Sequence, residues 1–197
     1  KHNKFLTAKL FHRNVEKIYV DTIVDEGTLN KNNTNFEIIN LKGHTLASIG
    51  ILTKDGVLFA GDLLVGEEVL NKYDFLFLQD VEEYLKSLDK IQSLDFNYLV
   101  LAHGRKVLDK DSTMLLINKH RQAIYKYLNQ IKENLKVPMN IDALLKKIIK
   151  ENELTYNYKE YYFFRTSLVT CISYLADLDE IDYTLEDSDL LYYTKIK

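Results

Sequence analysis

The chain has few of the residues that cross-link or interrupt a fold. Among its 197 residues are seven glycines, one proline and one cysteine. The single cysteine, Cys171, excludes a disulfide within the chain and suits a reducing compartment, so we expect a cytoplasmic location. No stretch approaches the roughly 18 consecutive apolar residues of a membrane span, and no signal-peptide pattern is visible. We therefore expect no membrane partner.

Excess positive charge is also missing. The formal net charge is −3 and the isoelectric point is near 6.0, so no general positive field would attract nucleic acid. Hydrophobic residues make up 46% of the chain and charged residues 28%, which is typical of a globular protein with one or two cores.

An Asp-Gly turn predicts a β-hairpin over residues 48–60. The turn Lys54-Asp55-Gly56 tolerates the positive φ angles that a tight hairpin needs, and both flanks have strand-like composition. Pairing of Lys54 with Val57 would place Ile49 opposite Asp62. The open end of the hairpin would then carry Asp62 back toward the segment that precedes the first strand.

Three side chains of metal-ligand type stand next to predicted strands. His44 precedes the hairpin, Asp62 follows it 18 positions later, and His103 follows the apolar run 98–102. Chemically active side chains often lie where buried strands end, because the sheet holds such ends rigidly side by side. The pattern therefore predicts a shared site.

These residues carry a specific resemblance. Gly43-His44-Thr45, Gly61-Asp62 and Ala102-His103-Gly104 resemble the third, fourth and fifth motifs of the metallo-β-lactamase-fold hydrolases. The resemblance implies an αββα sandwich with a site for two zinc ions (Zn2+). It also implies that His44 binds the first metal, Asp62 bridges both and His103 binds the second. Imidazole and carboxylate are suitable zinc ligands.

The family's earlier motif, His-x-His-x-Asp-His, is absent, and the chain begins with Lys1. We therefore expect the chain to be the C-terminal part of a longer polypeptide whose missing N-terminal segment completes the metal site. The family's usual proton-handling aspartate belongs to that motif, so no catalytic residue is assignable here. Alone, the chain is expected to bind metal weakly or not at all and to be inactive.

Other polar residues near the motifs have weaker interpretations. Arg105 and Lys106 are candidates for holding an anionic substrate group, against the default of a solvated loop. Thr45 and Ser48 are expected to form hydrogen bonds rather than to act as nucleophiles. His120 interrupts an apolar helical stripe and is expected to be a hydrogen-bonded packing residue rather than a ligand.

The remaining elements of the first half follow from local patterns. We expect a short helix over 1–12, a helix capped by Asp80 with a capping-box glutamate, strands over 17–21, 36–41 and 99–101, and a polar turn over 30–35. The apolar stretch 63–78 is expected to be a loop or short helix. Its aromatic residues are candidates for a substrate pocket wall, a homodimer contact or packing beneath the sheet: Tyr73, Phe75 and Phe77.

The pattern changes near residues 109–113, which predicts two domains, 1–110 and 113–197. The second is expected to contain helices over 114–135, from Asn140 and over 161–177, followed by a hairpin over 181–195. This order resembles a winged-helix domain, which is found in some metallo-β-lactamase-fold hydrolases. The full expectation is an α/β (α+β) protein with a partial αββα sandwich and a winged-helix-like domain.

Charge argues against nucleic acid as the partner of this domain. Residues 161–197 contain three basic and seven acidic side chains, which would repel phosphates. The aromatic cluster Tyr161-Tyr-Phe-Phe164 is better suited to docking onto the first domain or onto a second subunit.

The sequence thus favours a zinc-dependent hydrolase that acts on a small-molecule ester or thioester. One alternative is a non-catalytic interaction or regulatory module with an incomplete metal site. Another is a nucleic-acid phosphodiesterase that uses the winged-helix domain, which the acidic charge disfavours.

Overall fold

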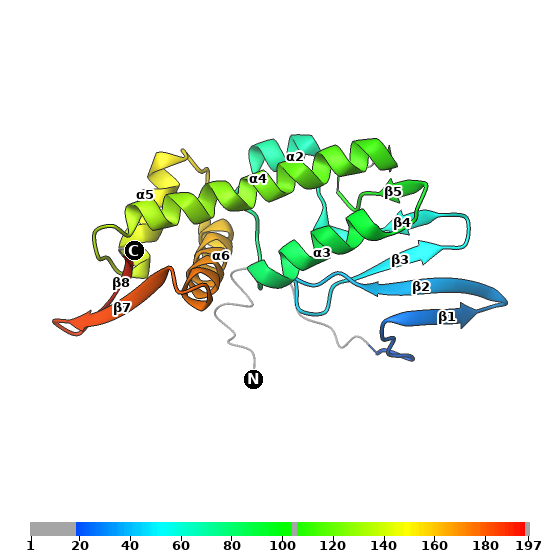
Figure 1. Ribbon diagram of the computed structural model, residues 1–197, viewed down its shortest axis with the longest axis horizontal. Helices are drawn as coiled ribbons and strands as arrows, with labels where there is room; N and C mark the ends of the chain where they lie inside the picture. The colour runs from blue at the N-terminus through cyan, green and yellow to red at the C-terminus, as the bar shows by residue number, and fades with distance from the viewer. Residues whose placement is uncertain (1–18, 104–105, 196–197) are drawn as a thin grey trace.

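The computed structural model describes residues 19–103 and 106–195, and its first half is a six-stranded sheet in the order β1-β2-β3-β4-β5-β6 (Figure 1). All neighbouring strands are antiparallel except β4 and β5, which run parallel. The strands are β1 (Gly27–Lys31), β2 (Thr34–Asn40), β3 (Ile49–Thr53), β4 (Val57–Phe59), β5 (Tyr98–Val100) and β6 (Val107–Asp109).

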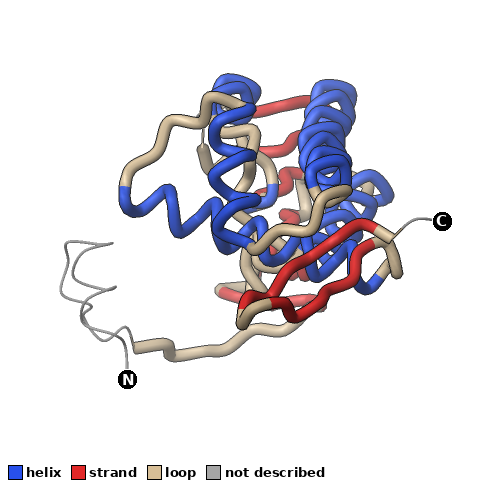
Figure 2. Tube along the Cα trace, turned by 90° about the vertical axis from the view of Figure 1, so that its left-hand side faces the viewer, coloured by secondary structure: helices blue, strands red, loops and turns tan. Residues whose placement is uncertain are grey.

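Helices pack beside this sheet and make up most of the second half. They are η1 (Gly61–Leu63), α2 (Glu67–Lys72), α3 (Val81–Ser93), α4 (Lys110–Asn134), α5 (Ile141–Glu151) and α6 (Tyr158–Asp177), followed by the hairpin β7 (Ile181–Glu186) and β8 (Asp189–Thr194). The long helix α4 extends from the sheet to α5 and α6 (Figure 1). Figure 2 looks along the molecule from the end at which the β7–β8 hairpin lies. Within the described parts of the chain, no helix is long and apolar enough to cross a membrane.

Local sequence signals place the helix starts. Each of four N-cap side chains accepts a hydrogen bond from a backbone N–H of the first turn, which would otherwise have no partner within the helix. The caps are Asp80, Asp109, Asn140 and Asn157. The predicted helices of this region are therefore confirmed. At α3 the carboxylate of Glu83 pairs with Lys86, and a full capping box is found instead at α6.

The two faces of the sheet differ in how well they are covered. Leu58 and Leu99 are opposite one another in the register and are fully buried, in one core with side chains of α3 and α4. The neighbouring row of paired residues, whose side chains lie on the opposite face of the sheet, is also apolar. It consists of Ile38, Ile51, Phe59, Val100 and Val107. In this row Phe59 remains 45% exposed and Val107 63% exposed. The described residues therefore leave much of one apolar face open to solvent.

Strand β1 was not predicted from the sequence. The predicted turn 30–35 is the tip of a hairpin between β1 and β2, with Asn32 and Asn33 both at positive φ, as a two-residue turn of the primed type requires. The predicted strand over 17–21 is wrong for residues 19–21, and its first two residues lie outside those described, as does the predicted helix over 1–12. Strand β1 has polar residues on both faces because it lies at the sheet edge, so it lacks an apolar alternation.

The register predicted for the β3–β4 hairpin is wrong by one residue. Ile51 faces Phe59 rather than Ala60, because the loop contains three residues instead of two. The N–H of Gly56 donates to the carbonyl of Thr53, and Gly56 has a φ of 79°. This is a turn followed by a left-handed glycine, the usual solution for a three-residue hairpin loop.

The aromatic segment after α2 meets α6. Phe75 stacks on Phe164 with centroids 5.8 Å apart, and Phe77 packs against Phe163 at 4.9 Å. These contacts confirm that the aromatic cluster of α6 docks onto the first half of the chain. One continuous buried core joins the two halves. The division at 110–113 and the winged-helix resemblance stay predictions.

Helix α3 lies very close to the loop that contains His44. The carbonyl of Gly43 accepts hydrogen bonds from the N–H groups of Gln79 and Asp80, at the start of the helix. Gly43 has a φ of +123°, and a Cβ atom there would lie 2.3 Å from the Cα of Tyr84. Only glycine allows this approach.

Substitution of Gly43 should therefore cost more stability than backbone strain alone explains. Gly27 is the matched control, because its φ is +131° but a Cβ there would meet nothing within 4 Å. We expect Gly27→Ala to lower the free energy of unfolding by about 1–3 kcal/mol from strain. Gly43→Ala should lower it by roughly 1–3 kcal/mol more, from crowding. Urea unfolding of both variants measures this, and equal losses would contradict the close-approach argument.

Candidate functional site

Strand direction brings the three candidate ligands together. Strands β2, β4 and β5 all run the same way, so their carboxyl ends lie at one end of the sheet. In the parallel register Phe59 is the partner of Val100. Asp62 and His103 each lie three positions beyond this pair, so they occupy equivalent places after the ends of β4 and β5. His44 lies in the loop after β2, at the same end.

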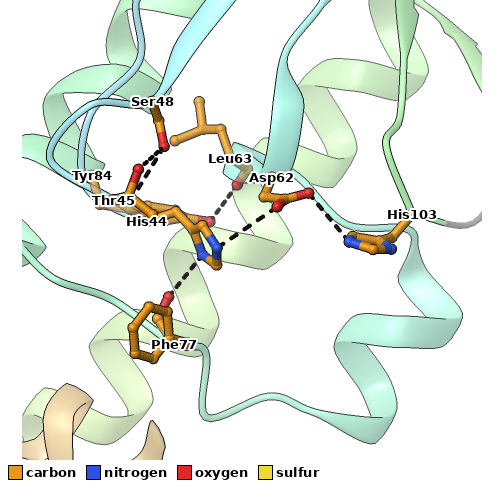
Figure 3. A network of polar contacts seen from close by, with 8 residues as sticks. All are labelled: His44, Thr45, Ser48, Asp62, Leu63, Phe77, Tyr84 and His103. Atoms are coloured by element: carbon orange, nitrogen blue, oxygen red, sulfur yellow. Dashed lines mark hydrogen bonds and ion pairs between the residues drawn. The ribbon is translucent and has the colours of Figure 1, made fainter. Parts of the chain in front are cut away.

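The two imidazoles approach Asp62 from different sides (Figure 3). Nε2 of His44 lies 3.8 Å from Oδ2, and Nε2 of His103 lies 3.2 Å from Oδ1. The His44 side chain is 27% exposed, whereas Asp62 and His103 are 43% and 63% exposed. Each oxygen of one carboxylate therefore faces a separate ring nitrogen.

The ring of His44 is held by the aromatic segment. Its Nδ1 lies 3.0 Å from the carbonyl oxygen of Phe77, which can only accept, so Nδ1 carries the proton. The Phe77 ring also packs edge-on against the imidazole, with centroids 5.4 Å apart. These contacts leave the Nε2 lone pair free on the Asp62 side, as a metal ligand requires.

A buried hydrogen-bond network supports the segment after Asp62. The Tyr84 hydroxyl donates to the carbonyl of Leu63 at 2.7 Å and lies 2.7 Å from Nδ1 of His120. Nε2 of His120 contacts the backbone of Val65, at 3.3 Å from its amide nitrogen and 3.1 Å from its carbonyl oxygen, so both ring nitrogens have partners. Burial lowers the pKa of His120 to about 4, so the ring is neutral. His120 is thus a buried, hydrogen-bonded packing residue, as expected from its position in the apolar stripe of the helix.

The donor set matches the chemistry of zinc. Ligands about 2.1 Å from a tetrahedral zinc ion lie roughly 3.4 Å from one another, and the two nitrogen–oxygen separations, 3.8 and 3.2 Å, bracket that value. Among the described residues, however, no group of three His, Cys, Asp or Glu side chains is placed so that it could hold a metal ion alone. The trio fits part of a metal site.

The other predicted polar residues lie elsewhere or bond locally. Nζ of Lys106 pairs with Glu68 at 2.9 Å, and this side chain does not line the cavity beside Asp62. Arg105 lies outside the described residues. The hydroxyls of Thr45 and Ser48 hydrogen bond to one another at 2.7 Å, the role expected for them.

A cavity of about 340 Å³ opens beside the three ligand candidates. The predicted aromatic wall takes part, since Tyr73, Phe75 and Phe77 all line it. Sequence reasoning did not place Lys159 or Phe163 of α6 there, although both line it. One signal could have found them: each half of the chain carries an aromatic segment, and the two segments pack on one another beside the cavity.

Comparisons with known proteins agree with this geometry. No protein-family model matches the chain. Hydroxyacylglutathione hydrolase 1 of Vibrio vulnificus is 32% identical over 135 residues, 66% of this chain and 51% of that protein. The Drosophila melanogaster beta-lactamase-like protein 2 homolog is 25% identical over 123 residues, 60% of this chain and 40% of that protein. The chain thus spans about half or less of the length of these relatives.

Solved structures of the same fold class superpose on the chain. A metallo-beta-lactamase family protein from Thermus thermophilus superposes with a TM-score of 0.67 at 15% identity, over 87% of this chain and 54% of that one. The chain therefore has the metallo-β-lactamase fold, and its α/β architecture is the one that the motifs implied.

The buried His120 predicts an acid-sensitive fold. Its pKa falls from about 6.5 in the unfolded chain to about 4 in the folded chain, so the unfolded state binds the additional proton between those values. The free energy of unfolding should therefore fall as pH drops from 6.5 to 4, by about 3 kcal/mol from this residue. Urea unfolding at several pH values measures the loss.

His120→Gln provides the comparison, because it keeps a polar side chain but removes the titration. Its stability difference between pH 7 and pH 4 should be smaller than that of the parent protein by about 3 kcal/mol. Parallel pH profiles for the two proteins would show that His120 is not the buried neutral group described above.

Proposed function

We propose that the intact protein is a metal-dependent hydrolase, with zinc ions held at His44, Asp62 and His103. One observation carries this proposal: each oxygen of the Asp62 carboxylate faces a different imidazole nitrogen, as expected of a carboxylate shared by two cations. A shared carboxylate offsets the repulsion between two positive ions. The relatives support hydrolysis, since one of them is a hydroxyacylglutathione hydrolase.

The residues of this chain would bind the zinc ions and hold the ligand side chains in the correct orientation. Bound zinc would supply a water of lowered pKa and would polarise the bond under attack. His44 would present Nε2, kept in the correct tautomer by the carbonyl of Phe77. Asp62 would be held in place by the hydrogen bond from Tyr84 to the next residue, Leu63. His103 would be the most solvent-exposed ligand.

Two imidazoles and one carboxylate are too few ligands for two zinc ions. We infer that the others come from residues outside 19–103 and 106–195, within this chain or beyond it, in a layer that also covers the open sheet face. The exposed part of the row, Phe59 and Val107, is the surface such a layer would bury, and its exposure supports the inference.

The proposed substrate is a small ester or thioester. Hydroxyacylglutathione, the substrate in the name of the Vibrio relative, is a thioester. A phosphodiester is disfavoured by the acidic charge of residues 161–197. We also propose that the protein acts in the cytoplasm, as the lone cysteine suggests.

A non-catalytic interaction module is the second candidate. It is favoured by the failure of any three described side chains to form a metal-holding group as placed. The two candidates differ in one measurable property, the stoichiometric retention of zinc by the folded intact protein.

Loss of the shared carboxylate should release metal and abolish hydrolysis. In the intact protein, Asp62→Asn should lower the zinc content and reduce thioester hydrolysis at least about 100-fold. Asp95→Asn is the control, because Asp95 is exposed and does not line the cavity. Elemental analysis and an assay with a thioester panel measure both effects.

Full zinc occupancy in Asp62→Asn would contradict the ligand role of this carboxylate. A folded parent protein that retains no zinc and cleaves no ester or thioester would favour the interaction module.

The open sheet face gives a separate prediction. Val107 and Val137 are 63% and 67% exposed in the described residues, but only Val107 lies in the apolar row of the sheet. If a further layer covers the sheet in the intact protein, Val107→Thr buries a hydroxyl and should cost about 1–2 kcal/mol of unfolding free energy. Val137→Thr should change it by less than about 0.5 kcal/mol. Equal small effects in urea unfolding would argue against a covering layer.

A further inference from the structure

We propose that the cavity between the ligand trio and α6 is an acyl-chain pocket, which selects substrates with a long unbranched apolar acyl group. This inference rests on the proposed hydrolase function and extends it to a substrate class. It concerns the body of the cavity, whose walls are built by both halves of the chain.

The cavity has a polar end and an apolar body. His44, Asp62 and His103 line the first, so a group held in the cavity would lie next to the reacting bond. The rest of the wall is largely aliphatic and aromatic, with Val65, Val69, Tyr73, Phe77 and Phe163 among its residues. A volume of about 340 Å³ is at the small end of ligand-binding cavities.

The buried polar side chains of the apolar body, Tyr84 and His120, already have hydrogen-bond partners. The Tyr84 hydroxyl donates to Leu63, and both ring nitrogens of His120 have partners. A polar ligand group that enters would therefore lose its hydrogen bonds to water without replacement, which costs free energy. An apolar chain gains by the same transfer, at about 0.8 kcal/mol for each buried methylene group.

The charges at the cavity are few. Besides the ligand trio and neutral His120, its charged lining residues are Lys159 and Glu160, at the start of α6. The Glu160 carboxylate is engaged, since it accepts from the N–H of Asn157 in the capping box. One lysine is a poor match for a nucleic-acid backbone, whose binding requires several phosphate contacts.

Phe163 is a wall residue of the cavity that α6 contributes. Its ring packs against Phe77, whose carbonyl in turn orients His44. A smaller residue at 163 would lengthen the cavity, and a larger one would shorten it. The neighbouring Tyr162 is also aromatic and on α6, but it does not line the cavity, so it serves as the matched control.

The first test measures hydrolysis by the intact zinc-loaded protein. Thioesters of one thiol with straight acyl chains from acetyl to dodecanoyl should show kcat/KM rising about fourfold for each added methylene group, until the cavity is full. In Phe163→Ala the optimum should move to longer chains, and in Phe163→Trp to shorter ones. Tyr162→Ala should keep the parent profile.

The second test does not depend on turnover. Calorimetric titration of the same protein with free carboxylates, from acetate to dodecanoate, should show affinity rising about fourfold for each methylene group. Phe163→Trp should weaken the binding of the longest chains, and Tyr162→Ala should not.

The outcomes separate the pocket from the reaction. Chain-length-dependent binding that responds to Phe163, without thioester cleavage, would support the pocket while the hydrolase proposal failed. Cleavage with kcat/KM independent of chain length, or a length profile that Phe163 and Tyr162 substitutions change equally, would overturn the acyl-chain pocket.

Discussion

The contact of α3 with the ends of two strands is the constraint on which the site depends. The backbone of Tyr84 lies against Gly43, and its hydroxyl holds the carbonyl of Leu63. One residue thus fixes the loop of His44 and the turn of Asp62 relative to each other. The same hydroxyl also bonds to Nδ1 of His120, so removing it would leave a buried carbonyl and a ring nitrogen without these partners. This makes a packing residue important for the geometry of the ligands.

The site is assembled by strand direction and closed by helices. Parallel pairing of β4 and β5 puts Asp62 and His103 at equivalent positions, and β2 brings His44 to the same end. Helix α6 begins more than 50 positions after His103 and adds Phe163 to the cavity wall. The C-terminal helices therefore contribute directly to the candidate active site.

Sequence signals worked where the structure depends on local chemistry. The N-caps Asp80 and Asn140 and the apolar face of α3 could be read directly, because capping and helical periodicity involve residues a few positions apart. Strand β1 was missed since an edge strand needs no apolar alternation. The register of the β3–β4 hairpin was wrong by one because Asp-Gly fits both two-residue and three-residue loops. In this protein the left-handed Gly56, together with the Thr53 side chain bonding to Val57, selects the longer loop.

The candidate ligands were also identifiable from the sequence, because glycine-flanked His and Asp residues after strands are a recognisable pattern. What the sequence by itself determined is therefore the residue types of the candidate ligands, the order of most elements and the fold class. Only the tertiary structure decided that Asp62 lies between two imidazoles, that Tyr84 and His120 hold its turn, and that Phe163 lines the cavity beside it. The reason is physical: these contacts join residues 18 to 86 positions apart, and their geometry depends on how sheet and helices pack rather than on local preference.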